Sequence, residues 1–394
     1  MMPIVIALGL LVAVATIPGT LELALLTFGG ALRARSSRKR SGSTTLRLAV
    51  VIPAHNEEKQ IARCVKSVLA AETNNIHLTV AVVADNCTDG TAQIARESGA
   101  EVLERTNHQE RGKGYALHHA FSLLQPRGFD VFMVVDADSV ISANALGEIC
   151  NVIADGADAA QCRYLVRNPG DSARTRLMNT ALLAFNVLRP RGRDRFGMSV
   201  GIFGNGFALT NETLTKVPYE ASSVVEDLEY HLALIRAGRR VRFVDGTTVF
   251  GDMPAAGQGV SSQRQRWEGG RFRMLAERGP GLLGSILHGK FRFVEPLLDL
   301  LLLPLAFHVV LLAMAAMTPS IVAREIAWSG IAVVSIHLIV TATVCGNGWR
   351  DLAALAAAPF YIVWKLLMLP SILRSSRTDT AWVRTERVPE ERVP

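Results

Sequence analysis

The chain has 394 residues, of which 49% are hydrophobic, and its 42 basic and 35 acidic side chains give a net charge of +7. So apolar a chain is typical of a protein with membrane segments. The basic residues gather at the edges of apolar stretches without a nucleic-acid-binding motif. This pattern excludes nucleic acid as the expected partner and favours anionic lipid head groups. Five cysteines without a Cys-x-x-Cys spacing fit neither a disulfide framework nor a zinc site, and favour a reducing compartment.

The N-terminal stretch, residues 1–32, is almost entirely apolar and is interrupted by Pro18, Gly19 and Glu22. Its length suffices to cross a bilayer. A cleaved signal peptide would carry its positive charge before the apolar run, whereas here the basic residues follow it. The positive-inside rule then places the next domain in the cytoplasm. We expect an uncleaved transmembrane anchor at 1–32 and a basic linker at 33–46.

The next region, residues 47–290, has the pattern of one soluble α/β domain. Apolar runs predict strands, and the segments between them predict helices: strands at 48–55, 78–85, 101–104 and 131–135, and helices at 61–71, 91–98 and 114–124. Strands that alternate with helices predict a parallel, doubly wound sheet. Basic and aromatic residues near 255–290 predict helices that lie at the membrane interface.

Three apolar runs follow, at residues 293–317, 326–345 and 352–369. The first two are long enough to cross a hydrocarbon core of about 30 Å. The third contains Lys365 and has prolines near it, so spanning, re-entrant and interfacial placements all remain open. Two spans would keep the basic tail, residues 374–394, in the cytoplasm, whereas three would place it outside. We expect a membrane region at 291–373 with two or three segments, and we favour a cytoplasmic tail.

The strand at 131–135 ends in two carboxylates, Asp136 and Asp138. Ligands of open α/β sheets bind beyond the carboxyl ends of the strands. Two hard oxygen ligands at this edge suit Mg²⁺ or Mn²⁺. Asp-x-Asp is also common in turns, so this interpretation depends on the other motifs of the chain.

Polar residues also follow the earlier predicted strands. Pro53, His55 and Glu57 stand at the end of the first strand, and Asp85 closes the second. Lys113 lies between two glycines just before a helix, where a cation can reach a nucleotide or its phosphates. Each of these features alone is weak, because capping residues and surface lysines are frequent at such positions.

In this order, VVIPAHNEE (50–58), Asp85, RGKGYAL (111–117) and Asp136-Ala137-Asp138 resemble a family 2 glycosyltransferase with a GT-A fold. Two later motifs extend the resemblance. VVEDLEY (224–230) resembles the segment that carries the catalytic base. QRQRW (263–267) matches the Gln-x-x-Arg-Trp motif, which is typical of the membrane-embedded synthases of cellulose, chitin, hyaluronan and poly-N-acetylglucosamine.

The resemblance implies a role for each matching residue. The catalytic base would be Asp227, with Glu226 beside it. Asp138 and Asp136 would hold Mg²⁺ or Mn²⁺. Two further sets would bind the substrates: Pro53, His55, Glu57, Asp85, Lys113, Asp136 and Arg266 for the nucleotide-sugar donor, and Gly204, Asn205, Gly206, Gln263 and Trp267 for the acceptor.

The expected protein is therefore an inverting hexosyltransferase. It has an α/β GT-A domain flanked by transmembrane helices. We expect a multi-pass protein of the cell inner membrane whose catalytic domain lies in the cytoplasm. The resemblance implies a nucleotide-diphospho-sugar donor, most often UDP-linked, and a β-glycosidic product for exopolysaccharide or cell-envelope biosynthesis. Either a growing glycan or a single lipid-linked hydroxyl could be the acceptor, and an export or assembly partner protein remains open. A nucleotide-sugar-binding protein without turnover and a transporter are less favoured. The first would not need all the acidic and basic site residues, and the second usually shows paired halves.

Overall fold

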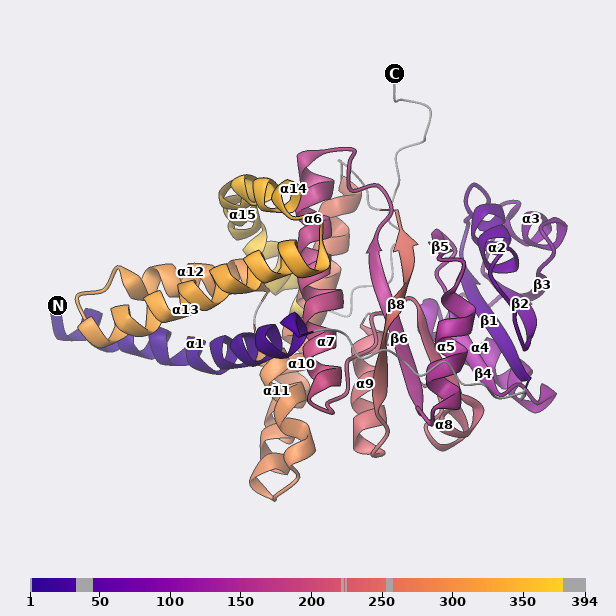
Figure 1. Cartoon of the computed structure of the whole chain (residues 1–394), viewed down its shortest axis with the longest axis horizontal. Coiled ribbons are helices and arrows are strands. Elements are labelled where there is room, and N and C mark those ends of the chain that lie inside the picture. The colour runs from indigo at the N-terminus through magenta and orange to yellow at the C-terminus, as the bar shows by residue number, and fades with distance from the viewer. Residues whose placement is uncertain are drawn as a thin grey trace. The chain divides into compact units, whose positions relative to one another are not determined.

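A computed structural model describes residues 2–32, 45–220, 223, 225–252, 258–302 and 304–377, except the side chains of 258–264, 266 and 377. The chain forms two compact units (Figure 1). The sheet unit comprises residues 33–168 and 193–253, and the helical unit comprises 1–32, 169–192 and 254–394. We expected one soluble domain over 47–290, but residues 169–192 and 254–290 group with the apolar helices of the helical unit.

In its described residues, the sheet unit has eight strands in the order β3-β2-β1-β4-β7-β6-β8-β5. The first four strands pair in parallel, as expected: β1 with β2, β1 with β4, and β2 with β3. The other half is mixed, because β7 runs antiparallel to β4 and β6, and β5 runs antiparallel to β8. The strands are β1 (Leu46–Ala54), β2 (Ile76–Asp85), β3 (Glu101–Arg105), β4 (Val131–Val134), β5 (Ser139–Ile141), β6 (Ala159–Val166), β7 (Phe207–Thr210) and β8 (Val241–Gly251).

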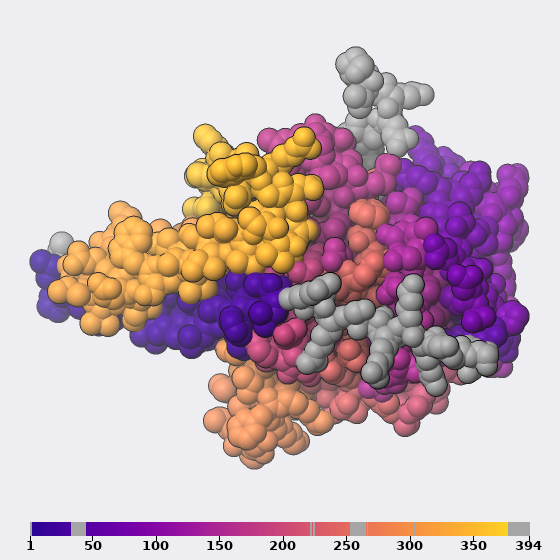
Figure 2. Space-filling view, viewed as in Figure 1, coloured from indigo at the N-terminus to yellow at the C-terminus, as the bar shows by residue number. Residues whose placement is uncertain are grey.

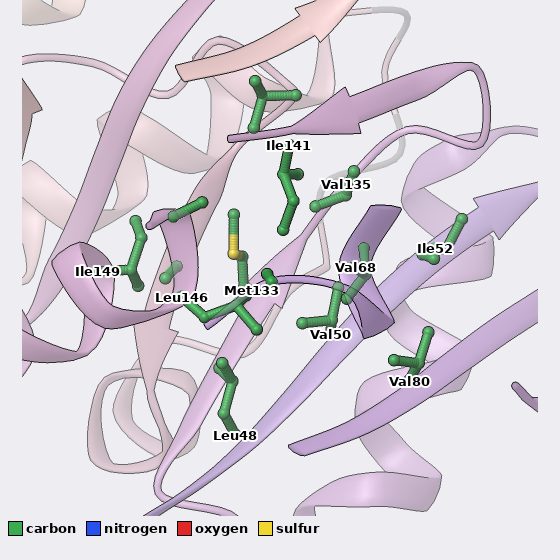
Figure 3. Packing of buried hydrophobic residues seen from close by; sticks show 14 of the residues in the cluster. Leu48, Val50, Ile52, Val68, Val80, Met133, Val135, Ile141, Leu146 and Ile149 are labelled. Carbon is green, nitrogen blue, oxygen red and sulfur yellow. The ribbon is translucent and has the colours of Figure 1, made fainter. Parts of the chain in front are cut away.

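The core of this unit lies where the central strands meet their covering helices (Figure 3). Leu48, Val50 and Ile52 of β1 share one face because they are two residues apart, and all three are fully buried. Met133 of β4 and Leu146 of α5 pack in the same cluster. The helices of this unit are α2 (Ile61–Leu69), α3 (Thr91–Glu97), α4 (Lys113–Leu124), η1 (Gln125–Arg127), α5 (Ala145–Ala154), α8 (Asn211–Lys216) and α9 (Glu226–Arg236).

Pro53 lies inside the central strand β1, where a missing N–H is usually not tolerated. The pairing explains how the strand accommodates it. β4 is paired with β1 only from Leu48 to Val51, so its ladder ends two residues before Pro53. Towards β2, the register continues through Pro53 opposite Val83. The proline therefore stands where β1 has already lost one neighbour, at the carboxyl edge of the sheet.

Among the residues that the structure describes, the helical unit contains three helical stretches that are long and apolar enough to cross a membrane: Met2–Ala31, Ile321–Cys345 and Trp349–Ser376. Its elements are α1 (Met2–Ala31), α6 (Ala173–Leu183), η2 (Ala184–Leu188), α7 (Arg189–Arg195, which continues into the sheet unit), α10 (Gln258–Leu287), η3 (Phe291–Phe293), α11 (Val294–Leu301), α12 (Leu305–Ala316), α13 (Ile321–Val340), η4 (Thr341–Cys345), α14 (Trp349–Ala354), η5 (Leu355–Ala357) and α15 (Ala358–Arg377).

Two expectations for the membrane region change in detail. The run at 293–317, expected as one span, forms two helices, Phe291–Leu301 and Leu305–Ala316, that are bent by 77°. Pro304 stands at the N-cap of α12, where its fixed φ suits the start of a new helix. The run at 352–369, whose placement was open, belongs to a helical stretch long enough to span, despite Lys365.

The long helices of this unit turn large apolar side chains outwards. Leu11 of α1 is 66% exposed, Ile321 of α13 is 67% exposed and Phe360 of α15 is 80% exposed. Soluble proteins rarely expose such surfaces over several neighbouring helices, so lipid is the expected surrounding. α1 lies beside α12 and α13 (Figures 1 and 2), although it is separated from them in sequence by the whole sheet unit.

Polar contacts join α1 to the C-terminal helices inside this unit. Thr27 Oγ1 lies 2.7 Å from His337 Nδ1. The carboxylates of Glu22, Glu295 and Asp299 lie within 4.8 Å of one another. Arg189 contacts Asp299 at 2.7 Å and Glu22 at 3.8 Å. Since Arg271 also contacts Asp299, two guanidinium groups offset this acidic cluster, and ion pairing explains it without a metal.

Candidate active site

The carboxyl ends of the parallel strands β1, β2 and β4 lie at one edge of the sheet unit and carry His55, Asp85 and Asp136. His55 Nδ1 lies 2.7 Å from the backbone carbonyl oxygen of Asp85, so the imidazole donates to it and ties the two strand ends together. Strands with this arrangement place their ligands beyond this edge. Three of the expected donor-site residues therefore share the same edge.

Lys113, at the start of α4, reaches from this edge towards α9. Its ammonium group donates to the carboxylate of Asp136 and to the carbonyl oxygen of Gly204. Gly204 has a φ of +78°, and a Cβ added there would lie 3.4 Å from Asp227 Oδ2 and 3.7 Å from Lys113 Nζ. Lys113, Asp136, Gly204 and Asp227 are thus neighbours in space, although they span more than one hundred residues of sequence.

The two acids at the start of α9, Glu226 and Asp227, are partly withdrawn from water. Burial raises the pKa of Glu226 to about 8, and the like charge of Asp227 adds to this effect. Burial also raises the pKa of Asp227. Two contacts partly offset this rise: the N–H of Leu228 donates to Asp227 Oδ1 at 2.8 Å, and the positive charge of Lys113 lies nearby. Such a carboxylate attracts a proton more strongly than an exposed aspartate does, as a general base requires.

The charge of Lys113 is secured by the acids around it. Burial by itself lowers the pKa of Lys113, but Asp136, Glu226 and Asp227 outweigh burial and raise the pKa above its ordinary value. The lysine therefore remains a cation at neutral pH, and it lies between Asp136 and the candidate base, Asp227.

The acidic turn after β4 rests on a buried polar network. The N–H of Asp136 donates to Asn205 Oδ1 at 3.1 Å, and Asn205 Nδ2 donates to Ser139 Oγ at 2.8 Å. Ser139 Oγ donates in turn to Asp138 Oδ1 at 3.0 Å. Asn205 and Ser139 are both fully buried, so these bonds fix the backbone and one carboxylate of the Asp-Ala-Asp turn. The side chain of Asn205, expected to touch the acceptor, instead lies beneath the acidic turn.

Gln161 of β6 completes this network, and no sequence motif pointed to it. Its Nε2 donates to the carbonyl oxygens of Asn205 and Gly206 at 2.8 and 3.2 Å, and its Oε1 accepts from the N–H of Phe203 at 3.0 Å. Gly206 is needed for packing, because a Cβ there would lie 2.5 Å from Cys162 Sγ. The loop over 203–206 is therefore held rigidly by β6.

The donor set at this turn fits a divalent metal ion. Asp136 and Asp138 are half-buried while Ala137 between them is buried, so both carboxylates lie on the open side of the strand end. Arg63 supports the same turn from α2, since its Nη2 donates to the carbonyl oxygen of Asp138 at 3.2 Å and to Asp252 at 2.5 Å. Hard carboxylate oxygens on a fixed turn are the ligands that Mg²⁺ and Mn²⁺ prefer.

Asp85, expected to contact the nucleotide, has a partner that the sequence did not reveal. Its Oδ1 accepts from Arg105 Nη1 at 2.8 Å, and both side chains are less than 10% exposed. Arg105 also contacts Glu110 at 3.0 Å and lies 5.9 Å from the ring of Tyr115. Because β3 is the neighbour of β2, the end of β3 places a guanidinium group beside the acid.

The remaining predicted residues belong to other elements or lie outside the described residues. Glu57 begins the turn before α2, and its N–H donates to Thr91 Oγ1 at 2.7 Å. The Gln-x-x-Arg-Trp motif lies in α10 of the helical unit, where Trp267 is half-buried. The side chains of Gln263 and Arg266 lie outside the described residues, so their contacts stay a prediction.

A family model described as "Glycosyltransferase like family 2" matches residues 46–270, which is more than half of the chain. The chain belongs to this glycosyltransferase family. The match covers both the sheet unit and the start of α10, so it includes the acidic turn, the first turn of α9 and the Gln-x-x-Arg-Trp motif. The narrower resemblance to the polysaccharide synthases stays a prediction.

Two curated relatives each match more than half of this glycosyltransferase. A probable glycosyltransferase, YdaM of Bacillus subtilis, is 26% identical over 233 residues, covering 57% of this chain and 55% of that protein. A beta-monoglucosyldiacylglycerol synthase of Nostoc is 25% identical over 238 residues, covering 58% of this chain and 50% of that protein. The match thus spans about half the length of each relative.

A solved structure supports the fold of this glycosyltransferase. The mannosyltransferase PcManGT from Pyrobaculum calidifontis, determined in complex with GDP-Man and Mn²⁺, has a TM-score of 0.53 at 17% identity. The match covers 86% of this chain and 97% of that one. The GT-A fold with flanking apolar helices is therefore confirmed.

Proposed function

We propose that this glycosyltransferase transfers a hexosyl group from a nucleotide-diphospho-sugar to the hydroxyl group of a lipid acceptor, with inversion of the anomeric centre and with Mg²⁺ or Mn²⁺. The observation that carries the proposal is the alignment of Asp136, Lys113, Gly204 and Asp227 within one site. It combines a candidate metal site, a permanent cation and a buried carboxylate of raised pKa, which are the groups that glycosyl transfer to a hydroxyl requires.

Asp227 would act as the general base. It accepts the proton of the acceptor hydroxyl, whose oxygen then attacks the anomeric carbon while the bond from that carbon to the donor's diphosphate breaks. Attack opposite the leaving group converts an α-linked donor into a β-glycoside. Burial raises the pKa of Glu226 to about 8, so this acid carries a proton at neutral pH, and Asp227 would be the ionised partner.

The leaving diphosphate would be met by positive charge. Asp138 and Asp136 would hold Mg²⁺ or Mn²⁺, which supplies Lewis-acid stabilisation of the leaving group when bound. Lys113 stands beside Asp136 and adds a fixed cation there. Asn205 and Gln161, buried beneath the turn, would act as positioning residues, and this role replaces the acceptor contact expected for Asn205.

The nucleotide would lie along the ends of β1–β3. There, His55 and Arg105 fix Asp85, whose carboxylate can accept from a base or ribose. Pro53 and Glu57 would border the nucleotide at the same edge of the sheet. The resemblance favours a UDP-sugar, whereas the structural neighbour PcManGT was solved with GDP-Man. Donors with different nucleobases should therefore be compared first.

A lipid acceptor is favoured by the apolar surfaces of α1, α13 and α15 and by the relative that is a beta-monoglucosyldiacylglycerol synthase. We place the protein in the cell inner membrane as a multi-pass protein with the sheet unit in the cytoplasm. Gln263, Arg266 and Trp267 would contact the acceptor or the leaving group, and Gly204 and Gly206 would let the loop approach the acceptor closely. Extension of a polysaccharide, with an export partner, is the second candidate, and the Gln-x-x-Arg-Trp motif favours it.

The test is nucleotide release by the purified protein in detergent or nanodiscs, with UDP-, GDP- and dTDP-sugars, Mg²⁺ or Mn²⁺, and membrane lipids as acceptor. We expect release from one donor only, with metal and lipid both required and with EDTA abolishing it. Asp227→Asn should lower turnover by about 10²–10⁴-fold and retain donor binding. Lys216→Met, which removes an exposed lysine of α8, serves as the control variant.

The products separate the candidates. One sugar on a lipid supports the proposal, and a ladder of lengths supports polymer extension. Donor binding without release, in a protein that unfolds cooperatively, would contradict enzymatic function and indicate a binding role. Wild-type turnover by Asp227→Asn would contradict the role of the base.

A further inference from the structure

The helix that carries the Gln-x-x-Arg-Trp motif is held against the last helix of the chain. α10 and α15 pack together within the helical unit. Ser375 Oγ donates to the carbonyl oxygen of Gln265 at 3.1 Å, inside the motif itself. Two turns later, Arg273 Nε donates to the carbonyl oxygen of Ser376 at 3.1 Å. The contact thus follows α10 from the motif onwards.

A buried ion pair lies at the centre of this contact. Glu268, the residue directly after Trp267, forms an ion pair with Lys365, with 2.7 Å between Oε1 and Nζ, and both side chains are about 5–6% exposed. The ammonium group also lies 4.9 Å from the ring of Phe307 and 5.8 Å from the ring of Tyr361. Charges among apolar helices are costly, and they are retained where they set which surfaces meet.

Close backbone packing surrounds this pair. A Cβ added at Gly269 would lie 3.3 Å from Ser375 Cβ and 3.2 Å from the carbonyl oxygen of Ile372. Phe272, one turn further along α10, packs on Phe307 with ring centroids 6.2 Å apart. The glycine allows the two helices to approach, and the ion pair selects their register.

We propose that Glu268 and Lys365 are a positioning pair, which fixes the rotation of the Gln-x-x-Arg-Trp helix on α15 and so aims Trp267 at the acceptor. This inference rests on the proposed function for its kinetic consequence, but its structural part does not. An apolar contact alone would let α10 rotate or slide, because apolar side chains tolerate several registers. The buried pair penalises every register in which the two charges separate.

The kinetic test compares Glu268→Gln with the double variant Glu268→Met and Lys365→Met. In the single variant a buried ammonium loses its charged partner, so we expect lower thermal stability and a higher KM for the acceptor, with the donor KM unchanged. The double variant should regain thermal stability, because no unpaired charge is left. Its kcat/KM for the acceptor should remain up to about 100-fold below the wild-type value, because misplacement of a substrate-contacting group by about 1 Å suffices for a loss of that size.

A disulfide test reports on register without activity. Cβ atoms in disulfides lie about 3.8 Å apart, so Gly269→Cys with Ser375→Cys should cross-link in native membranes after a few tenths of an ångström of adjustment. Peptide mapping would identify the bond, and either single substitution serves as the control. In a chain that also carries Glu268→Met and Lys365→Met, we expect slower and incomplete cross-linking.

These readouts separate the two proposals. If the wild type shows no turnover but cross-linking depends on the pair, the proposed function fails and the positioning pair stands. If cross-linking is as fast without the pair, or if the double variant regains full acceptor kcat/KM, the pair is merely structural and this inference is overturned. Loss of donor binding in Glu268→Gln would likewise contradict it, since the pair would then act beyond the acceptor side.

Discussion

The ammonium group of Lys113 donates to the carboxylate of Asp136. This contact joins the start of α4 to the acidic turn after β4, and it also places the cation near both acids of α9. One lysine therefore balances the candidate metal site and the candidate base. The charge states of the two halves of the site depend on each other, and Lys113 is where that dependence can be tested.

The first prediction concerns Lys113→Met. Burial raises the pKa of Asp227 while the charge of Lys113 lowers it. The base works when deprotonated, so the acid limb of the kcat/KM profile should lie above the ordinary aspartate range of about 3.9. Removing the lysine should move this limb to still higher pH and slow turnover. An acid limb that stays in place would show that Asp227 is not the titrating base.

The second prediction concerns stability and Glu226. The folded-state pKa of Glu226 is raised from 4.5 to about 8, so folding favours its protonated form. This contribution is fully present below about pH 4.5 and is lost as the pH rises through about 8. In Glu226→Gln, the melting temperature should fall less between pH 5 and pH 9 than in the wild type. Glu97→Gln, at an exposed position on α3, is the control, and equal slopes in all three proteins would refute the prediction.

The third prediction concerns Gln161→Met. The amide of Gln161 serves two carbonyl oxygens and one N–H of the loop over 203–206. Methionine keeps the volume but leaves these buried groups without that partner, at a cost of about 1–3 kcal/mol in unfolding free energy. The acidic turn should also bind Mn²⁺ more weakly, which titration calorimetry would measure. Gln93→Met, which removes an exposed bond to Glu97, should change neither quantity.

The fourth prediction contrasts two adjacent buried tyrosines. The ring centroids of Tyr219 and Tyr230 lie 4.4 Å apart. Tyr230 Oη donates to the carbonyl oxygen of Val217 at 2.7 Å, whereas the Tyr219 hydroxyl is buried with no hydrogen-bond partner among the described residues. Tyr230→Phe should cost about 1 kcal/mol, while Tyr219→Phe should be neutral or stabilising. Equal destabilisation in thermal unfolding would show that Tyr219 has an acceptor.

The sequence predicted those parts of the site that depend on local pattern. Asp136 and Asp138 follow a buried strand, and parallel pairing brings them to the edge that also holds His55 and Asp85. Arg105 could not be predicted in the same way, because its contact with Asp85 depends on β3 lying beside β2. Asn205 was assigned to the acceptor from its glycine-flanked loop, and only burial shows that its side chain faces the acidic turn instead.

Hydropathy likewise predicted where the apolar segments lie but not their geometry. The run at 293–317 is apolar apart from Glu295, Asp299 and His308, so its average hydropathy does not reveal a bend of 77° before α12. Residues 169–192 were hard to assign for a different reason. They contain several arginines, which favour a soluble domain in a hydropathy analysis, yet they group with the apolar helices of the helical unit. Arg189 is an example: its charge is matched by Asp299 inside the helical unit.

The division of the chain has a consequence for folding. The chain passes between the two units at residues 32–33, 168–169, 192–193 and 253–254. β7 and β8 of the sheet therefore emerge from the ribosome only after α6, which belongs to the other unit. The sheet cannot close until this helix has been synthesised. A protein truncated after residue 253 would keep α1 and α6 without the later helices of their unit, so an independently folding sheet fragment would require removal of residues 1–32 and 169–192 as well.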